Sequence, residues 1–240
     1  MTRKFKILAL AICAAAMAAV APAAAQAETG ALTTQQFPSF VTGEQLGGVT
    51  FDVGAAPIRT VSCTSNLEQT LVGPADPVTF VPKYTNCSSE PGFTPVTITR
   101  NGCDYSVGFT RPGSTGTPPT TGTMQAWINC PAGQQIQIHV YENAFMHAAN
   151  ISTCTYDIGP QGPVPAGIYH DTAGVGMIPD VDATINARFT AQATLGVGGP
   201  ICGGNPETQH LPITLTGNYT IRGYQDVNGV EGPQIPVHVG

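Results

Sequence analysis

The sequence predicts an all-β protein, specifically a disulfide-stapled antiparallel β-sandwich of about eleven strands. Three observations predict this class: period-2 alternation of apolar and polar residues, 28 glycines and 21 prolines spread over 240 residues, and seven cysteines. Strands separated by Gly/Pro turns imply a sandwich or a barrel. We prefer the sandwich because a closed transmembrane barrel needs lipid-facing apolar residues and aromatic girdles. Here the polar strand faces are rich in Thr and Asn, and aromatic residues make up only 7%.

Residues 1–27 are predicted to be a signal peptide. Three basic residues lie within the first six positions, an apolar run follows from residue 7 to about residue 20, and Ala25-Gln26-Ala27 supplies the small residues of a cleavage site. We expect cleavage before Glu28. A retained membrane anchor is the alternative, because the apolar run approaches the length that spans a bilayer.

Charge excludes one large class of function. Charged residues make up 10% of the chain, against roughly 25% in an average soluble domain. Loss of the leader would leave six Lys and Arg against 15 Asp and Glu, a net charge of −9. Such a chain has few bases to neutralise phosphates, so we expect no nucleic-acid partner.

The mature chain divides into an N-terminal segment, residues 28–46, and a sandwich domain, residues 47–240. The first of these lacks strong alternation and is predicted to be loosely attached. Strands are predicted at 48–53, 57–66, 78–85, 94–99, 103–109, 123–130, 134–142, 150–158 and 166–171. Residues 143–149 are predicted to form at most one helical turn.

Alternation is clearest near the C-terminus, where two long strands are predicted. Apolar residues occupy every second position from Ala183 to Leu195. In the second strand, one face is predicted to carry Leu211, Ile213, Leu215, Tyr219 and Ile221. The intervening segment is rich in Gly and Pro, so the two strands are predicted to form a hairpin with a long loop.

Six cysteines remain after export, and an even number in an oxidising compartment predicts disulfides. Antiparallel partners have a constant index sum, and pairing Cys103 with Cys130 places Tyr105 opposite Ile128 and Val107 opposite Ala126. Every pair is apolar, which favours a Cys103–Cys130 disulfide. The same register sends Trp127 to the opposite face, across from Ser106.

The other four cysteines are assigned with less support from the register. Cys63 and Cys87 flank a Gly73–Pro77 turn, but the implied pairing of Leu67 with Lys83 matches poorly. Cys154 and Cys202 then pair by elimination among the fifteen possible connectivities. Zinc is the competing use of cysteine, but no C-x-x-C or Cys/His cluster is present, so no metal is predicted.

The cysteine-containing segments resemble a group of exported six-cysteine β-proteins of actinobacteria that has no assigned activity. The resemblance rests on Val61-Ser-Cys63, Tyr84-Thr-Asn-Cys87, Asn101-Gly-Cys103-Asp-Tyr105, Asn129-Cys130-Pro-Ala-Gly133, Cys154-Thr-Tyr156 and Ile201-Cys202-Gly203. It covers most of residues 47–225 and implies a bacterial source. It supplies no catalytic residues.

Motifs that carry chemistry are sparse. Tyr169-His170-Asp171 places a base beside a carboxylate, but neighbours on a strand point to opposite faces, so no dyad is expected there. Asp226-Val-Asn228-Gly-Val-Glu231 has the oxygen spacing of a partial calcium loop, and an Asn-Gly turn explains it equally well. No catalytic residue and no cofactor are predicted.

Trp127 is the one binding candidate. An exposed indole stacks on sugar rings or anchors a partner protein, whereas burial under another sheet or loop is the structural alternative. We therefore expect a secreted, non-catalytic extracellular or cell-envelope protein with a binding or structural role. Its partner would be an envelope polysaccharide or another extracellular protein, and no transmembrane segment remains after cleavage.

The enzymatic alternative is a secreted hydrolase acting on envelope polymers. It requires distant strands to bring His170, Glu142 or Asp171 together in one cleft. A third class, an inhibitor or toxin-like effector, would present a projecting ordered loop such as Arg111–Gly122.

Overall fold

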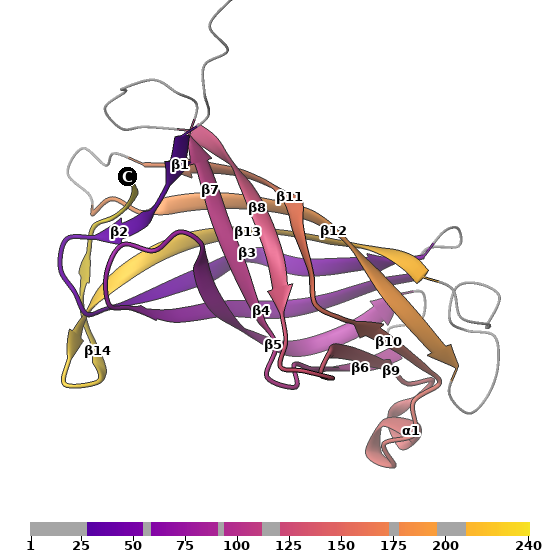
Figure 1. The fold of residues 1–240 in the computed structure, drawn as a ribbon. Coiled ribbons are helices and arrows are strands. Elements are labelled where there is room, and N and C mark those ends of the chain that lie inside the picture. Colours follow the sequence, from indigo (N-terminus) through magenta and orange to yellow (C-terminus); the bar gives the residue numbers. More distant parts are fainter. Residues whose placement is uncertain (1–27, 55–58, 91–93, 112–120, 173–177, 196–209) are drawn as a thin grey trace, which may run out of the picture.

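The computed structural model describes residues 28–54, 59–90, 94–111, 121–172, 178–195 and 210–240. Regular structure in these ranges is almost entirely antiparallel β-sheet (Figure 1). The strands are β1 (Glu28–Gly30), β2 (Leu32–Thr34), β3 (Ser39–Val53), β4 (Arg59–Leu71), β5 (Val78–Glu90), β6 (Thr94–Thr99), β7 (Asp104–Arg111), β8 (Thr121–Asn129), β9 (Ile136–Val140), β10 (Cys154–Ile158), β11 (Gln161–Asp171), β12 (Val181–Leu195), β13 (His210–Val227), β14 (Val230–Ile235) and β15 (Val237–Val239). The helix α1 spans Ala144–Ala148.

Thirteen of the described strands belong to one sheet, and this sheet closes on itself. Strands β3, β4, β5, β7, β8, β11, β12 and β13 pair in that order, and β13 pairs back with β3, every pair being antiparallel. We call these eight strands the strand ring. The predicted all-β antiparallel class is confirmed. The ring replaces the expected two-sheet arrangement of about eleven strands, because the β3–β13 pairing joins the first and last long strands.

At three neighbouring places in the strand ring, two shorter strands separated by a break lie along one line. Strand β5 pairs with β7 through Val78–Phe80 and with β6 through Ser88 and Ser89. Strand β12 pairs in the same way with β11 near one end and with β10 near the other. Strands β6 and β7, β8 and β9, and β10 and β11 therefore each follow one course, broken at residues 100–103, 130–135 and 159–160.

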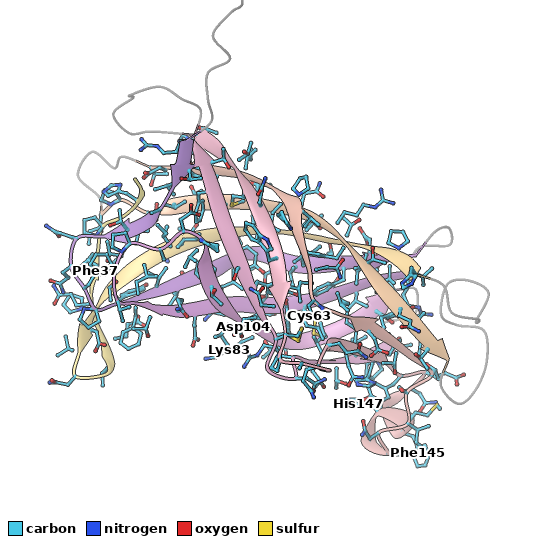
Figure 2. All side chains as sticks on the ribbon, in the orientation of Figure 1. Phe37, Cys63, Lys83, Asp104, Phe145 and His147 are labelled. Atoms are coloured by element: carbon cyan, nitrogen blue, oxygen red, sulfur yellow. A yellow bond between two sulfur atoms is a disulfide. The ribbon has the colours of Figure 1, made fainter. Side chains whose placement is uncertain are left out.

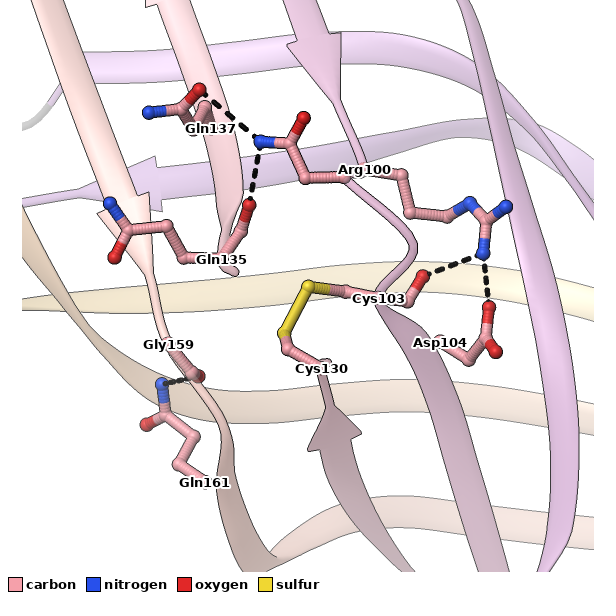
Figure 3. Close-up of a disulfide and its surroundings, with 9 residues drawn as sticks. Arg100, Cys103, Asp104, Cys130, Gln135, Gln137, Gly159 and Gln161 are labelled. Atoms are coloured by element: carbon pink, nitrogen blue, oxygen red, sulfur yellow. Dashed lines mark hydrogen bonds and ion pairs between the residues drawn. A yellow bond between two sulfur atoms is a disulfide. The ribbon is translucent and has the colours of Figure 1, made fainter. Parts of the chain in front are cut away.

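Covalent and hydrogen bonds connect the broken strands (Figure 3). The Cys103–Cys130 disulfide joins the break before β7 to the break after β8. The Asn101 amide donates to the Gln135 carbonyl at 3.0 Å and to the Gln137 side chain at 3.2 Å. Arg100 donates to the Cys103 carbonyl at 2.9 Å and forms an ion pair with Asp104. The disulfide and the Asn101 bonds hold neighbouring strands together where the backbone ladder stops, and the Arg100 bonds join residues within the break before β7.

The register predicted from Cys103 and Cys130 is confirmed. Tyr105 lies opposite Ile128, Val107 opposite Ala126, and Phe109 opposite Met124. All six of these side chains are buried. Local alternation was sufficient here because β7 and β8 form a regular pair without a bulge.

Cys63 and Cys87 are also bonded, as predicted. The implied partner of Leu67 was wrong, because a bulge between Ser62 and Thr64 shifts the register by one residue and places Leu67 opposite Pro82. Asn86, with φ of 52°, supplies the extra residue in a left-handed conformation that Asn tolerates. Cys154 is disulfide-bonded as well, and Cys202, its predicted partner, lies outside the described residues.

Residues 28–46 differ from the loose segment that was expected. Strand β1 pairs with β7, β2 pairs with β15, and β3 begins at Ser39 and pairs on both sides from that residue onward. Leu32 and Val41 are completely buried. Single short strands carry too little alternation to be recognised from sequence, and a boundary at residue 47 would cut through β3.

The C-terminal hairpin is confirmed, and two smaller features lie at its ends. Strands β12 and β13 pair without a break from Val181 opposite Ile221 to Gln192 opposite His210. Asn228 and Gly229, both with positive φ, turn the chain from β13 into β14, and the Gly229 N–H donates to Asp226 at 2.6 Å. The expected helical turn is α1, whose Phe145 is 78% exposed (Figure 2).

Candidate functional site

Trp127 lies on the outer face of the strand ring, as its register predicts. It pairs with Ser106 of β7, while its neighbours on β8, Ala126 and Ile128, point into the core. The indole is half-buried. On its other side β11 bulges between Gln161 and Val164, so Trp127 faces an irregular stretch rather than a regular ladder.

Two glycines form the surface beneath the indole. A Cβ placed on Gly108 of β7 would lie 3.1 Å from two atoms of the six-membered ring, and one on Gly162 of β11 would lie 3.0 Å from Cδ1. The indole therefore extends across β8 from one neighbouring strand to the other. Glycine within a strand often marks the close approach of another group, and the glycines give the sequence signal that we missed.

Polar groups surround the indole on the same face. Ser106 is hydrogen-bonded to Thr79 at 2.8 Å and accepts from the Asn129 amide at 2.6 Å. Ser106 is buried although it faces outward, because Trp127 lies directly across from it. Gln125 and Asn129 are exposed on β8 on either side of Trp127. We call Gly108, Gln125, Trp127, Asn129 and Gly162 the Trp127 face.

This face borders the strand breaks. Asn129 ends β8 immediately before Cys130, and Gln161 begins β11 immediately before Gly162. Figure 3 shows Cys130 and Gln161 in this region. The Gln161 amide donates to the Thr190 carbonyl at 2.8 Å and accepts from the Thr190 N–H at 2.7 Å. The Gln161 side chain thus takes the place of backbone pairing with β12 at Thr190.

The histidines and carboxylates singled out in the sequence do not converge in the described residues. His170 is exposed and hydrogen-bonded to Thr121 at 2.8 Å. Asp171 points inward, as the alternation requires, and is completely buried. Glu142 is exposed beside α1, near the end of the ring where β12 ends.

Asp171 has a partner that sequence reasoning missed. Its carboxylate accepts from the Val239 N–H at 3.1 Å and lies 3.2 Å from His238 Nδ1. This contact attaches β15 to the end of β11. The only sequence signal was the Val-His-Val alternation at 237–239, which is too short to place. The contact between β11 and β15 therefore gives Asp171 and His238 a structural role at the end of β11.

Two further observations concern metals and membranes. Within the described ranges, no group of three or more His, Cys, Asp or Glu side chains is placed to hold a metal ion. No helix among the described residues has the length and apolar character needed to cross a bilayer.

Comparisons with known proteins add no assignment. No protein-family model matches the chain, and neither the curated proteins nor the solved structures contain a match.

Proposed function

We propose that the protein is exported and acts outside the cytoplasm, in the medium or at the cell envelope, as a non-catalytic binding protein. The leader-like segment and the disulfides support this location. Cleavage before Glu28 would leave β1 intact, since its pairing with β7 begins at Glu28 opposite Arg111. Membership of the exported six-cysteine group remains part of this proposal.

The Trp127 face is the proposed binding surface, and envelope polysaccharide is the proposed partner. The observation that carries this proposal is an indole laid across two strand glycines and flanked by Gln125 and Asn129. A sugar ring presents an apolar face, which stacks on an aromatic side chain, and hydroxyls, which hydrogen-bond to amides. The net negative charge does not oppose a neutral polysaccharide.

The hydrolase alternative receives less support from the geometry. It requires His170, Asp171 and Glu142 to converge, whereas His170 points outward, Asp171 is bonded to β15, and Glu142 lies beside α1. The proposed inhibitor loop, Arg111–Gly122, falls mostly outside the described residues.

Substitution of Trp127 tests the proposal. We expect Trp127→Ala to weaken retention on insoluble cell-wall polysaccharide by more than tenfold, because a central aromatic anchor contributes about 2 kcal/mol or more. Trp127→Phe should keep part of the binding, since a smaller ring still stacks. Co-sedimentation with washed wall polysaccharide measures both.

Two further variants separate binding from folding. Thr123 lies on the same outer face of β8. The variant Thr123→Ala leaves the indole in place, so it should bind the polysaccharide like the wild type. Gly108→Val keeps Trp127 but introduces side-chain atoms where the six-membered ring lies, so it should reduce binding. Full retention by a Trp127→Ala variant with native far-UV circular dichroism would overturn the polysaccharide proposal.

A further inference from the structure

A buried arginine lacks a counter-ion at the end of the strand ring where β6, β9 and β10 take the places of β7, β8 and β11. Arg59 begins β4, and its side chain points into the ring, with only 9% of the residue exposed. None of the ion pairs among the described residues includes Arg59. An unpaired charge taken out of water is costly, so this buried guanidinium favours an anion beside it.

The carboxylates nearest to Arg59 along the strands face the other way. Thr60, the next residue on β4, pairs with Asp52 of β3 and Glu90 of β5. Neighbours on a strand point to opposite faces, so these two acids lie on the outer face while Arg59 points inward. The Asp52 carboxylate accepts from Thr60 at 2.6 Å, and Glu90 is exposed. The other buried charged residue in the described ranges, Asp171, is bonded to β15.

Most of the hydrogen-bonding capacity of Arg59 is unused within the described part of the chain. One of its Nη atoms donates to the Ser89 hydroxyl at 2.9 Å. Ser89 is completely buried and is hydrogen-bonded in turn to Thr94. The other N–H groups of the guanidinium have no partner among the described residues. A guanidinium is a planar fork of donors that matches the two oxygens of a carboxylate.

A second unpartnered group lies in the same interior. Tyr156 of β10 is completely buried, and its hydroxyl has no hydrogen-bond partner among the described residues. Strands β5, β6 and β9 lie between β4 and β10 in the sheet, so Arg59 and Tyr156 enter the interior from different walls. Burial raises the pKa of Tyr156, and the positive charge of Arg59 opposes this rise. The two groups are therefore close enough to interact electrostatically.

We propose that Arg59 and Tyr156 bind the carboxylate of a small organic monoanion. The guanidinium supplies the charge and paired donors, and the Tyr156 hydroxyl supplies a further donor. A single positive charge matches a monoanion, whereas a dianion would leave an uncompensated charge in the interior. The ligand must be small, because the flanking inward-facing residues Val53 and Val61 are almost completely buried. The inference is independent of the proposed polysaccharide surface, which lies on the outer face.

Arginine side-chain resonances offer a direct test with controls in the same molecule. Arg100 and Arg222 are paired with Asp104 and Glu44. With isotope-labelled arginine, intact disulfides and chloride-free buffer, formate is expected to shift the Arg59 Nε–H signal saturably in the millimolar range. The Arg100 and Arg222 signals should stay unchanged. The substitution Arg59→Gln assigns the signal.

Two tyrosine variants show whether Tyr156 contacts the anion. Tyr156→Phe should weaken formate binding about tenfold, measured from the Arg59 signal, because a hydrogen bond to a charged group is lost. Tyr169→Phe is the matched control. The Tyr169 hydroxyl is also buried without a partner among the described residues, but it interacts electrostatically with Arg111 and Asp171. Tyr169→Phe should therefore bind formate like the wild type.

Removal of the positive charge gives a second measurement. Formate should raise the urea midpoint of the wild type saturably, since a ligand that binds only the folded state stabilises it. Arg59→Met keeps a long side chain without the charge and should lose this increase, and Arg59→Gln serves if that variant fails to fold. Chloride should bind at least tenfold more weakly than formate, because a single sphere cannot accept two parallel N–H bonds.

The site is overturned if the Arg59 signal does not respond to formate, or if the Arg59 variants keep the formate-dependent increase in urea midpoint. Equal binding by Tyr156→Phe and Tyr169→Phe would overturn the role of Tyr156, and equal binding of chloride and formate would overturn the assignment of a carboxylate. Trp127→Ala should bind formate normally, so failure here is distinguishable from failure of the polysaccharide proposal.

Discussion

The tyrosine hydroxyls buried inside the strand ring affect the stability of the folded protein. Tyr84, Tyr105 and Tyr219 lie around one cavity, and removal of their hydroxyls from water raises their pKa values. The sequence placed Tyr105 and Tyr219 correctly on inward faces, because strand alternation decides direction. It did not show that Tyr84 meets Tyr105, since that contact follows from the pairing of β5 with β7.

These tyrosines should make the protein sensitive to alkaline pH. A phenol with a pKa of about 10 in the unfolded chain and a higher pKa in the folded chain stabilises the fold fully below about pH 10. That contribution is lost as pH rises above about 10 towards the folded pKa. We expect Tyr84→Phe to reduce this loss, measured as the free energy of unfolding in urea from pH 7 to about 11.

The stability change caused by Tyr84→Phe at neutral pH is the reference for its effect at alkaline pH. At neutral pH the substitution should cost about 0.5–1.5 kcal/mol, because it removes the hydrogen bond to Tyr105. Identical alkaline slopes for the wild type and Tyr84→Phe would contradict a raised pKa at this residue.

The sequence predicted most strands and missed four short ones, and the four missed strands share one cause. The expected 94–99 agrees with β6, and expected strands overlap β3 to β13. Strands β1, β2, β14 and β15 were missed because three to six residues, some containing Gly or Pro, show little alternation. Their stability comes from tertiary partners, such as the Asp171 carboxylate that accepts from the Val239 N–H of β15.

Gln161 lies next to the break between β10 and β11, and substitution tests how much its side chain stabilises the protein there. Its amide forms two hydrogen bonds to the Thr190 backbone in place of ladder bonds. Gln161→Ala should destabilise the protein by about 1–3 kcal/mol, since each bond contributes about 0.5–1.5 kcal/mol. Urea unfolding followed by circular dichroism measures this change.

A matched substitution shows whether the effect belongs to those two bonds. Gln125→Ala removes an exposed glutamine from neighbouring β8 and should change stability by less than about 0.5 kcal/mol. Equal small effects of both substitutions would mean that the Gln161 amide contributes nothing to the join between β11 and β12.

Closure of the ring predicts a single cooperative unit. Each ring strand is paired on both sides. The buried apolar side chains form one core cluster, which includes Leu32 of β2 and Val239 of β15. We expect fluorescence of Trp127, the sole tryptophan, and far-UV circular dichroism to give coincident urea transitions with the disulfides oxidised. A fluorescence transition at lower urea concentration would show instead that β7, β8 and β11 unfold separately.

The sequence by itself determined the all-β class, the direction of alternating side chains and the Cys103–Cys130 register, because these depend on residues near one another along the chain. It also directed attention to Trp127. Tertiary structure alone decided the ring closure, the contact between Tyr84 and Tyr105 and the glycine surface beneath the indole. Each of these depends on strands that are distant in sequence, and local periodicity does not specify which strands become neighbours.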